Sequence, residues 1–115
     1  MRRGEIRMVD LDPARGSEAS KVRPAVIVSN NGANAAAQRS GSGVLAVVPL
    51  TSNVTRIYPF QVLLPATQCG LPRDSKAQAE QIRSVTAVRI GRRLGVLPTD
   101  LMAQLDMALR LHLEL

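Results

Sequence analysis

Two short segments of the sequence carry side chains suited to phosphate chemistry. Arg23 directly precedes the apolar run PAVIVS (24–29), and Thr51 and Ser52 come shortly after a second apolar run, VLAVVP (44–49). A guanidinium can bind two phosphate oxygens and neutralise charge that develops in a transition state, while a hydroxyl can orient a phosphate. The spacing alone is equally compatible with an ordinary arginine at a strand edge and a threonine that caps a turn.

Several other catalytic chemistries lack the residues that they need. The sequence has no P-loop, no dinucleotide-binding glycine motif and no H-E-x-x-H zinc motif, and its single histidine, His112, excludes a catalytic histidine pair. The lone Cys69 excludes an internal disulfide and a zinc site of several thiolates, and we interpret it as a small buried hydrophobe. Asp10 and Asp12 are a weak candidate for Mg²⁺. We therefore expect neither a metal nor another cofactor.

The distribution of charge indicates a polyanionic partner. Fifteen Lys and Arg against nine Asp and Glu give a net charge of +6. No acidic residue lies between Glu18 and Asp74, whereas five cations do: Lys21, Arg23, Arg39, Arg56 and Arg73. We interpret this window as one wall of an anion-binding face, and a basic surface that serves only solubility is the alternative. Because Tyr58 and Phe60 are the only aromatic residues, aromatic stacking on bases is limited to two rings.

Short strands must position these residues. The segment 5–11 alternates imperfectly before a turn, 24–29 and 44–49 have the β-branched apolar composition of buried strands, and 60–64 ends at Pro65. Pro24 is tolerated at the first position of a strand, where a missing N–H does no harm. If 24–29 and 44–49 pair in antiparallel order, Arg23 and Thr51 converge at the same edge of the sheet.

The remaining segments alternate between loops and short elements. We expect exposed loops at 14–21, 30–43 and 66–74, the second with at most one helical turn. In 75–85 the alternation places Gln81 on the alanine face, which predicts a bend, a bulge or a polar group at the core edge. A last strand at 86–91 then turns into a C-terminal helix with Thr99 as its N-cap. One stripe of this helix holds Leu101, Leu105, Ala108, Leu109 and His112.

These elements predict one small domain that spans residues 1–115. Five to seven short strands and a terminal helix indicate a mainly β fold, a small and strongly bent antiparallel barrel. No apolar run approaches the about 20 residues that a membrane helix needs. The N-terminal residues are charged where a secretion signal would be apolar, so we expect a cytoplasmic protein.

Three motifs in order resemble one known family. They are G-E-I…V-D-L-D-P at 4–13, R-P-A-V-I-V-S-N at 23–30 and P-L-T-S at 49–52, and GLPRDSKAQAEQIRSV at 70–85 extends the match over nearly the whole chain. The sequence is similar to the MazF/PemK toxins of bacterial type II toxin–antitoxin systems. This resemblance implies an SH3-like barrel of the MazF/PemK/CcdB type that forms a homodimer. It also implies a metal-independent endoribonuclease that cuts single-stranded RNA at specific sequences, in mRNA or also in tRNA or rRNA.

The resemblance also implies roles for individual residues. The family's catalytic arginine and threonine fall on Arg23 and Thr51, and its substrate contacts fall on Glu18 and Gln81. Beside these motifs we add Lys21, Ser52 and Asn53 as candidate substrate contacts. In the family mechanism the RNA 2′-OH attacks the adjacent phosphate, which leaves a 2′,3′-cyclic phosphate and a 5′-OH. Since arginine remains protonated in proteins, we favour electrostatic stabilisation over proton abstraction for Arg23.

One departure and two alternatives accompany this interpretation. Arg7 and Met8 stand where many relatives have aromatic residues, which weakens any expectation of base stacking on that strand and leaves sequence preference to the loops at 12–22 and 30–43. A non-enzymatic gyrase-binding toxin of the same fold, similar to CcdB, would act through the C-terminal helix end. An RNA-binding barrel without cleavage is the other alternative. A basic toxin predicts a cognate antitoxin that is acidic and partly disordered.

Overall fold

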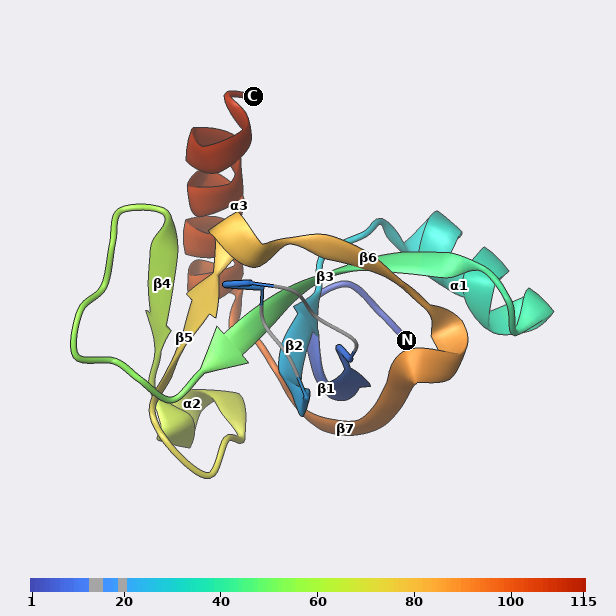
Figure 1. Ribbon diagram of the computed structural model, residues 1–115, viewed down its shortest axis with the longest axis horizontal. Coiled ribbons are helices and arrows are strands. Elements are labelled where there is room, and N and C mark those ends of the chain that lie inside the picture. Colours follow the sequence, from blue (N-terminus) through green and yellow to red (C-terminus); the bar gives the residue numbers. More distant parts are fainter. Residues whose placement is uncertain (13–15, 19–20) are drawn as a thin grey trace.

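The computed structural model describes residues 1–12, 16–18 and 21–115, so part of the predicted loop at 14–21 lies outside the described residues. A bent sheet of seven antiparallel strands has α3 along one side and α1 at the far end (Figure 1). The strands are β1 (Glu5–Asp10), β2 (Val22–Ile27), β3 (Val44–Thr51), β4 (Gln61–Leu64), β5 (Ser75–Gln78), β6 (Arg83–Thr86) and β7 (Ile90–Val96). The helices are α1 (Asn31–Ser40), α2 (Ala66–Cys69) and α3 (Thr99–Leu113), with 3₁₀ turns η1 (Ala79–Gln81) and η2 (Ala87–Arg89).

The strand order is β4-β5-β3-β2-β1-β7, and β6 pairs with β3 beside this path. The predicted mainly β fold with a C-terminal helix is confirmed. Among the described strands, β4 and β7 stand at the two ends of the order and do not pair with each other, so the bent sheet is not closed into a complete barrel.

Strand β3 changes partner along its length, and two prolines mark the change. Its first residues pair with β6 up to Val47↔Arg83, whereas its last residues pair with β5 from Leu50↔Ala77 onward. Pro49 lies between these two ladders, where no hydrogen bond to either is needed. The ladder between β2 and β3 ends at Ala25↔Pro49, one residue after Pro24. Pro24 is thus the third residue of β2 rather than the first, and pairing with β3 begins directly after it.

Two hydrophobic clusters cover the two faces of the sheet. Side chains in a strand alternate between faces, and β2 illustrates this, because Val26 belongs to the cluster under α3 and Ile27 to the one under α1. The predicted stripe on α3 is confirmed for Leu101, Leu105, Ala108 and Leu109, which are buried, while His112 is exposed. Because both faces are covered, the strand has the continuous apolar sequence that predicted burial.

The predicted loop at 30–43 is wrong, since the structure has a ten-residue helix there, α1. Asn30 caps it by accepting a hydrogen bond from the Ala33 amide at 2.8 Å, and Gly41 ends it in the left-handed conformation with φ of 72°. Asn34 is fully buried, and its side-chain Nδ2 donates to the Ser29 carbonyl at 2.9 Å. Tertiary packing and two good caps outweigh a composition that is typical of a loop.

Among the other predicted elements, one is confirmed and the rest differ from the prediction. The bend expected near Gln81 is confirmed, because η1 separates β5 from β6. The predicted strand at 86–91 begins as η2, and the segment 92–97, predicted as a turn, continues β7 to Val96. Pro98 rather than Thr99 occupies the N-cap of α3, without a side-chain hydrogen bond. The loop at 66–74 contains the single turn α2.

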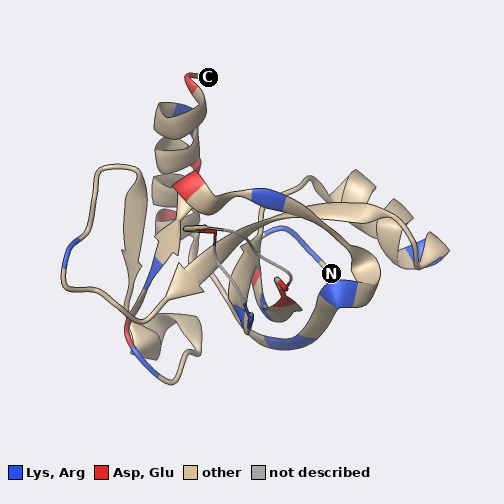
Figure 2. Cartoon of the chain, viewed as in Figure 1, with Lys and Arg blue, Asp and Glu red and all other residues tan. Residues whose placement is uncertain are grey.

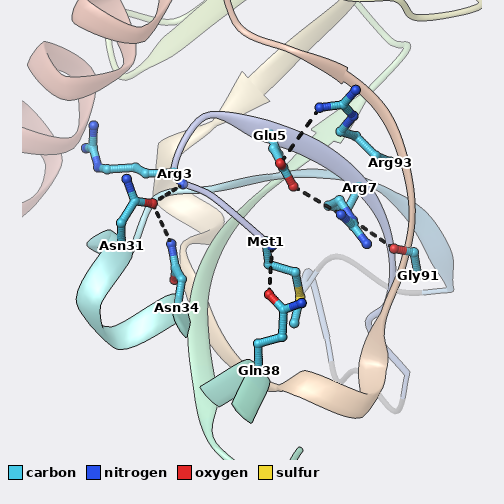
Figure 3. A network of polar contacts seen from close by, with 9 residues as sticks. All are labelled: Met1, Arg3, Glu5, Arg7, Asn31, Asn34, Gln38, Gly91 and Arg93. Atoms are coloured by element: carbon cyan, nitrogen blue, oxygen red, sulfur yellow. Dashed lines mark hydrogen bonds and ion pairs between the residues drawn. The ribbon is translucent and has the colours of Figure 1, made fainter. Parts of the chain in front are cut away.

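A network of polar contacts ties the N-terminal segment to α1 and β7 (Figure 3). The Arg3 amide donates to Asn31 Oδ1 at 2.7 Å, and the Arg7 guanidinium donates to Glu5 Oε1 at 3.0 Å. Arg93 lies 3.9 Å from the other oxygen of Glu5. Burial of Glu5 raises the pKa of its carboxyl, but hydrogen bonds from the Arg2 backbone and the Arg7 side chain outweigh burial, so the net pKa is lowered.

Candidate functional site

A pocket of about 330 Å³ opens where β3 leaves β2 to pair with β5. The register that pairs Ala25 with Pro49 would place Arg23 opposite Thr51, but the ladder has ended and the strand ends diverge. Both residues line the pocket, as the antiparallel pairing of their strands predicted. The loop after α2 closes the remaining wall with Leu71, Pro72 and Arg73.

The pocket is cationic and has an apolar floor. Among the described residues that line it, three are cations, Lys21, Arg23 and Arg73, and none is Asp or Glu. Figure 2 shows a Lys or Arg stretch at the start of β2 and another in the loop after α2, both in the lower part of the view. Such a site suits a phosphodiester, because its cations neutralise the phosphate while apolar walls limit competition from water.

The two candidate cations from the opening segment differ in their surroundings. Arg23 is half-buried in β2 and its side chain is engaged within the structure, so the strand fixes its position. Lys21 is exposed and has a positive φ of 68°, in the left-handed region that non-glycine residues seldom adopt. Its amide donates to Asp12 Oδ1 at 2.7 Å, and its carbonyl accepts from the Leu11 amide at 3.0 Å. These bonds hold the chain in the turn that enters β2.

The hydroxyl side of the pocket comes from the end of β3. Thr51 is half-buried, and its Oγ1 accepts a hydrogen bond from the Asn53 amide at 3.3 Å. Ser52 is exposed and also lines the pocket. Asn53 does not line it, and its Oδ1 instead accepts from the Thr55 amide at 3.3 Å. Thr51 and Ser52 are therefore placed for contact with a ligand, while the side chain of Asn53 shapes the following loop.

The candidate contacts Glu18 and Gln81 lie outside this pocket. Gln81 is half-buried at the end of η1, and its Nε2 donates to the Ser17 carbonyl at 3.1 Å. Glu18 is the next residue of that loop and is exposed, and it too has a partner within the structure. The two predicted contacts are thus brought together with each other, at the loop between β1 and β2, and not with Thr51.

Arg73 and Ser75 also line the pocket, although no motif in the sequence indicated them as site residues. Ser75 Oγ donates to the Arg73 carbonyl at 3.1 Å, so the two residues form one turn. Arg73 belongs to the acid-free window, and the register of β5 against β3 brings it to the site. Arg39, from the same window, lies in the last turn of α1 and does not line the pocket. The window is therefore not one continuous wall.

The weak magnesium candidate has a structural role instead. The Asp12 amide donates to Asp10 Oδ1 at 3.1 Å, and Asp12 accepts from Lys21, so both carboxylates support the loop before β2. Within residues 1–12, 16–18 and 21–115, no group of three His, Cys, Asp or Glu could hold a metal ion. Cys69 is free and 1% exposed. This burial confirms the interpretation as a small buried hydrophobe, and burial together with the charge of Asp100 raises the pKa of its thiol.

Comparison with known families accounts for this arrangement. The model of PemK-like, MazF-like toxins of type II toxin–antitoxin systems matches residues 2–113. The chain belongs to this family. It is 63% identical to endoribonuclease MazF9 from Mycobacterium tuberculosis, over all of this chain and 98% of that protein. The resemblance found in the three sequence motifs is therefore confirmed, and the CcdB-like alternative is not favoured.

Solved structures agree with the fold of this MazF-like toxin. MazF from Deinococcus radiodurans has a TM-score of 0.82 at 26% identity, covering all of this chain and 97% of that one. A mycobacterial endoribonuclease solved in complex with its cognate antitoxin has a TM-score of 0.77 at 24% identity, covering all of this chain and 96% of that one. At 24% identity, the similarity to this mycobacterial structure is evidence for the fold alone. No helix in the described part of the toxin is long and apolar enough to cross a membrane.

Proposed function

We propose that this toxin is a sequence-specific endoribonuclease that cuts single-stranded RNA without a metal ion. One observation carries the proposal: Arg23 and Thr51 line one cationic pocket in a chain that is 63% identical to an endoribonuclease. The residues that the family motifs select thus lie where a phosphodiester could contact both. Messenger RNA is the primary substrate class, and tRNA or rRNA are further candidates.

In this proposal the ribose 2′-oxygen attacks the adjacent phosphorus, and the bond from phosphorus to the 5′-oxygen breaks. The 2′-OH proton passes to water, and the leaving 5′-oxygen takes a proton from water. The products are a 2′,3′-cyclic phosphate and a 5′-OH. Arg23 stabilises the charge that develops on the pentavalent phosphorus, and Thr51 holds the scissile phosphate. A strand end fixes each side chain, which suits a site that works by orientation and charge.

The other candidate contacts divide into two groups. Lys21 and Ser52 line the same pocket as Arg23, so we assign them to the phosphates next to the scissile one. Gln81 bonds to Ser17, the neighbour of Glu18 in the loop between β1 and β2, and we assign Glu18 and Gln81 to a base outside the pocket. Asn53 lies after Thr51 in the loop that leaves the pocket, and we keep it as a substrate contact of this loop.

The proposal includes two protein partners. An acidic cognate antitoxin would cover the cationic pocket, and a mycobacterial endoribonuclease of the same fold was solved with its antitoxin. A second copy of the chain would form a homodimer, and the exposed apolar residues Met107 and Leu111 on α3, 71% and 57% exposed, offer a surface for such contacts. We place the activity of this single domain in the cytoplasm, where messenger RNA and antitoxin are both available.

Cleavage without metal ions tests the proposal. Purified toxin is incubated with mixed-sequence single-stranded RNA in excess EDTA, beside an Arg23→Ala variant. We expect discrete cuts by the wild type and a loss of about two to three orders of magnitude in rate for the variant. Absence of cleavage by the wild type, or equal cleavage by both proteins, would contradict it.

A further inference from the structure

The loop between β3 and β4, residues 52–60, holds both aromatic rings of the chain in one stack. The rings of Tyr58 and Phe60 lie 5.4 Å apart between centroids and 13° from parallel. The guanidinium carbon of Arg56 lies over the Tyr58 ring, 4.6 Å from its centroid. At the other end of the stack, the centroid of the Phe60 ring lies 6.2 Å from that of the His112 ring on α3. We call Arg56, Tyr58 and Phe60 the loop stack.

A buried lysine holds the loop stack in place. Lys76 on β5 is only 8% exposed, although lysine is seldom buried without partners. Its Nζ donates to the Arg56 carbonyl at 2.7 Å and lies 5.8 Å from the centre of the Tyr58 ring. Lys76 therefore fixes the backbone of Arg56 and contacts the ring on which the Arg56 side chain rests.

The loop stack is continuous with the catalytic pocket. Lys76 is the ladder partner of Thr51, and the loop begins at Ser52, which lines the pocket. The loop has no acidic residue, and Arg56 is its single Lys or Arg. The loop runs along the outer side of β4 (Figure 1). An extended RNA strand that leaves the pocket past Thr51 would run along this loop.

The Arg56 side chain is available to a ligand. It is exposed, as is Tyr58 at 38%, and within the described part of the chain its guanidinium makes no hydrogen bond or ion pair. A guanidinium plane supported by a ring is a surface on which unpaired bases stack. Its backbone and ring partners are already in place, so little ordering is needed on binding.

We propose that the loop stack is a base-stacking platform for single-stranded RNA, with Arg56 as the contact and Lys76 as its positioning residue. The inference rests on the proposed function for its substrate class. The platform binds one base beyond the two nucleotides that flank the scissile phosphate. Because every base has a stacking face, this contact adds affinity with little sequence preference. It raises binding of substrate and transition state equally, so it acts on KM and leaves kcat unchanged.

Fluorescence of a base analogue tests the platform directly. A series of single-stranded RNA oligonucleotides carries 2-aminopurine at one position each, and its quenching is titrated with proteins that all carry Arg23→Ala to prevent cleavage: the otherwise wild-type chain, Arg56→Gln and Arg39→Gln. The two variants lose the same charge, and Arg39 lies on α1 outside the pocket. We expect quenching at a position outside the scissile pair, lost in Arg56→Gln with about a five- to tenfold weaker Kd, and retained in Arg39→Gln. Equal Kd and quenching for wild type and Arg56→Gln would overturn the inference.

The role of Lys76 has its own test. Lys76→Met keeps the length of the side chain but removes the bond to the Arg56 carbonyl, and thermal unfolding checks that it folds. We expect KM for RNA cleavage to rise about as much as in Arg56→Gln at unchanged kcat, and the double variant to add little, because the two residues act through one contact. Fully additive effects, or a fall in kcat alone, would contradict positioning through Arg56.

These measurements separate this inference from the proposed function. Quenching in the Arg23→Ala background reports binding independently of cleavage, so quenching there together with no RNA cleavage by the wild type contradicts the nuclease proposal and leaves the platform supported. A wild type that cleaves RNA while Arg56→Gln matches it in Kd and KM retains the nuclease proposal and overturns the platform.

Discussion

At the scale of single residues, the site depends on where β2 and β3 stop pairing. Arg23 lies two residues before the last pair of the β2–β3 ladder and Thr51 two residues after it, so both residues lie where these two strands separate. Pro24 suits this end of the β2–β3 ladder, because it has no N–H to donate to β3. The charge of Arg23 can therefore remain at the rim of a strand whose residues from Ala25 to Ile27 are fully buried.

The shape of the guanidinium, beyond its charge, should matter at this position. Arg23→Lys keeps the positive charge but loses the planar fork that binds two phosphate oxygens. We expect kcat for RNA cleavage to fall by roughly a hundredfold. Steady-state kinetics checks this, with Arg39→Lys as a control that should behave as wild type. Near-normal kcat for Arg23→Lys would mean that charge alone is sufficient.

The Glu5 carboxyl should make stability depend on pH. Its pKa is lowered in the folded protein, so its ionised form stabilises the fold above the unfolded pKa of about 4.5, and this contribution is lost as pH falls through the folded pKa. Glu5→Gln should cost about 1–2 kcal/mol at pH 7 and progressively less below about pH 4.5. Urea unfolding of the wild type and of Glu5→Gln, at pH 7 and below about pH 4.5, measures this difference in stability. A loss of stability that does not change with pH would contradict a stabilising role of the ionised carboxyl.

At the scale of elements, the strands that local composition indicates could be predicted from the sequence. The elements that depend on contacts with distant parts of the chain could not. The runs at 24–29 and 44–49 are buried on both faces, so their composition alone indicated β2 and β3. The break at Gln81 indicated the bend at η1. By contrast, α1 depends on caps at Asn30 and Gly41 and on burial of Ala37 against the sheet, and β7 depends on pairing with β1 across more than 80 residues of chain.

The same limit applies to the site. The motifs selected Arg23 and Thr51, and antiparallel pairing explained why they meet. Arg73 reaches the pocket only because β5 pairs with the end of β3, a register that no local pattern encodes. Gln81 and Glu18 were selected by resemblance, and the structure places them beside the first loop rather than in the pocket.

A close approach of α2 to β7 fixes the wall of the pocket. A Cβ on Gly95 would collide with the Cys69 carbonyl, and one on Gly70 would lie 2.8 Å from the Leu94 carbonyl. Gly95→Ala should therefore destabilise the toxin by about 3 kcal/mol. Gly41→Ala, which has a φ of 72° and no neighbour within 4 Å, should cost only about 1 kcal/mol. Thermal unfolding compares the stability of the two variants, and equal losses of stability would exclude close packing as the cause.

At the scale of the whole molecule, part of the net charge of +6 lies on the surface that we propose binds RNA. Three cations line the pocket and Arg56 extends the cationic surface along the β3–β4 loop. An RNA strand that follows this path exchanges counterions for side-chain contacts, and an acidic antitoxin would compete for the same surface.

RNA binding should consequently depend steeply on salt. If three phosphates contact the pocket cations, log Kobs should fall with log salt with a slope of about −2. Binding titrations of a single-stranded oligonucleotide with the Arg23→Ala variant, which avoids cleavage, should show a slope reduced by about 0.7. A slope near zero for this variant would contradict a binding surface built on phosphate contacts.

The central claim is that the pocket uses the RNA 2′-OH as its nucleophile. The most direct measurement compares a cleaved RNA oligonucleotide with the same oligonucleotide carrying one 2′-deoxy sugar on the 5′ side of the cut, in EDTA, with mass analysis of the ends. The account predicts a 2′,3′-cyclic phosphate and a 5′-OH from the first and no cut at that bond in the second. Cleavage of the deoxy-substituted bond, or a 5′-phosphate product, would contradict it.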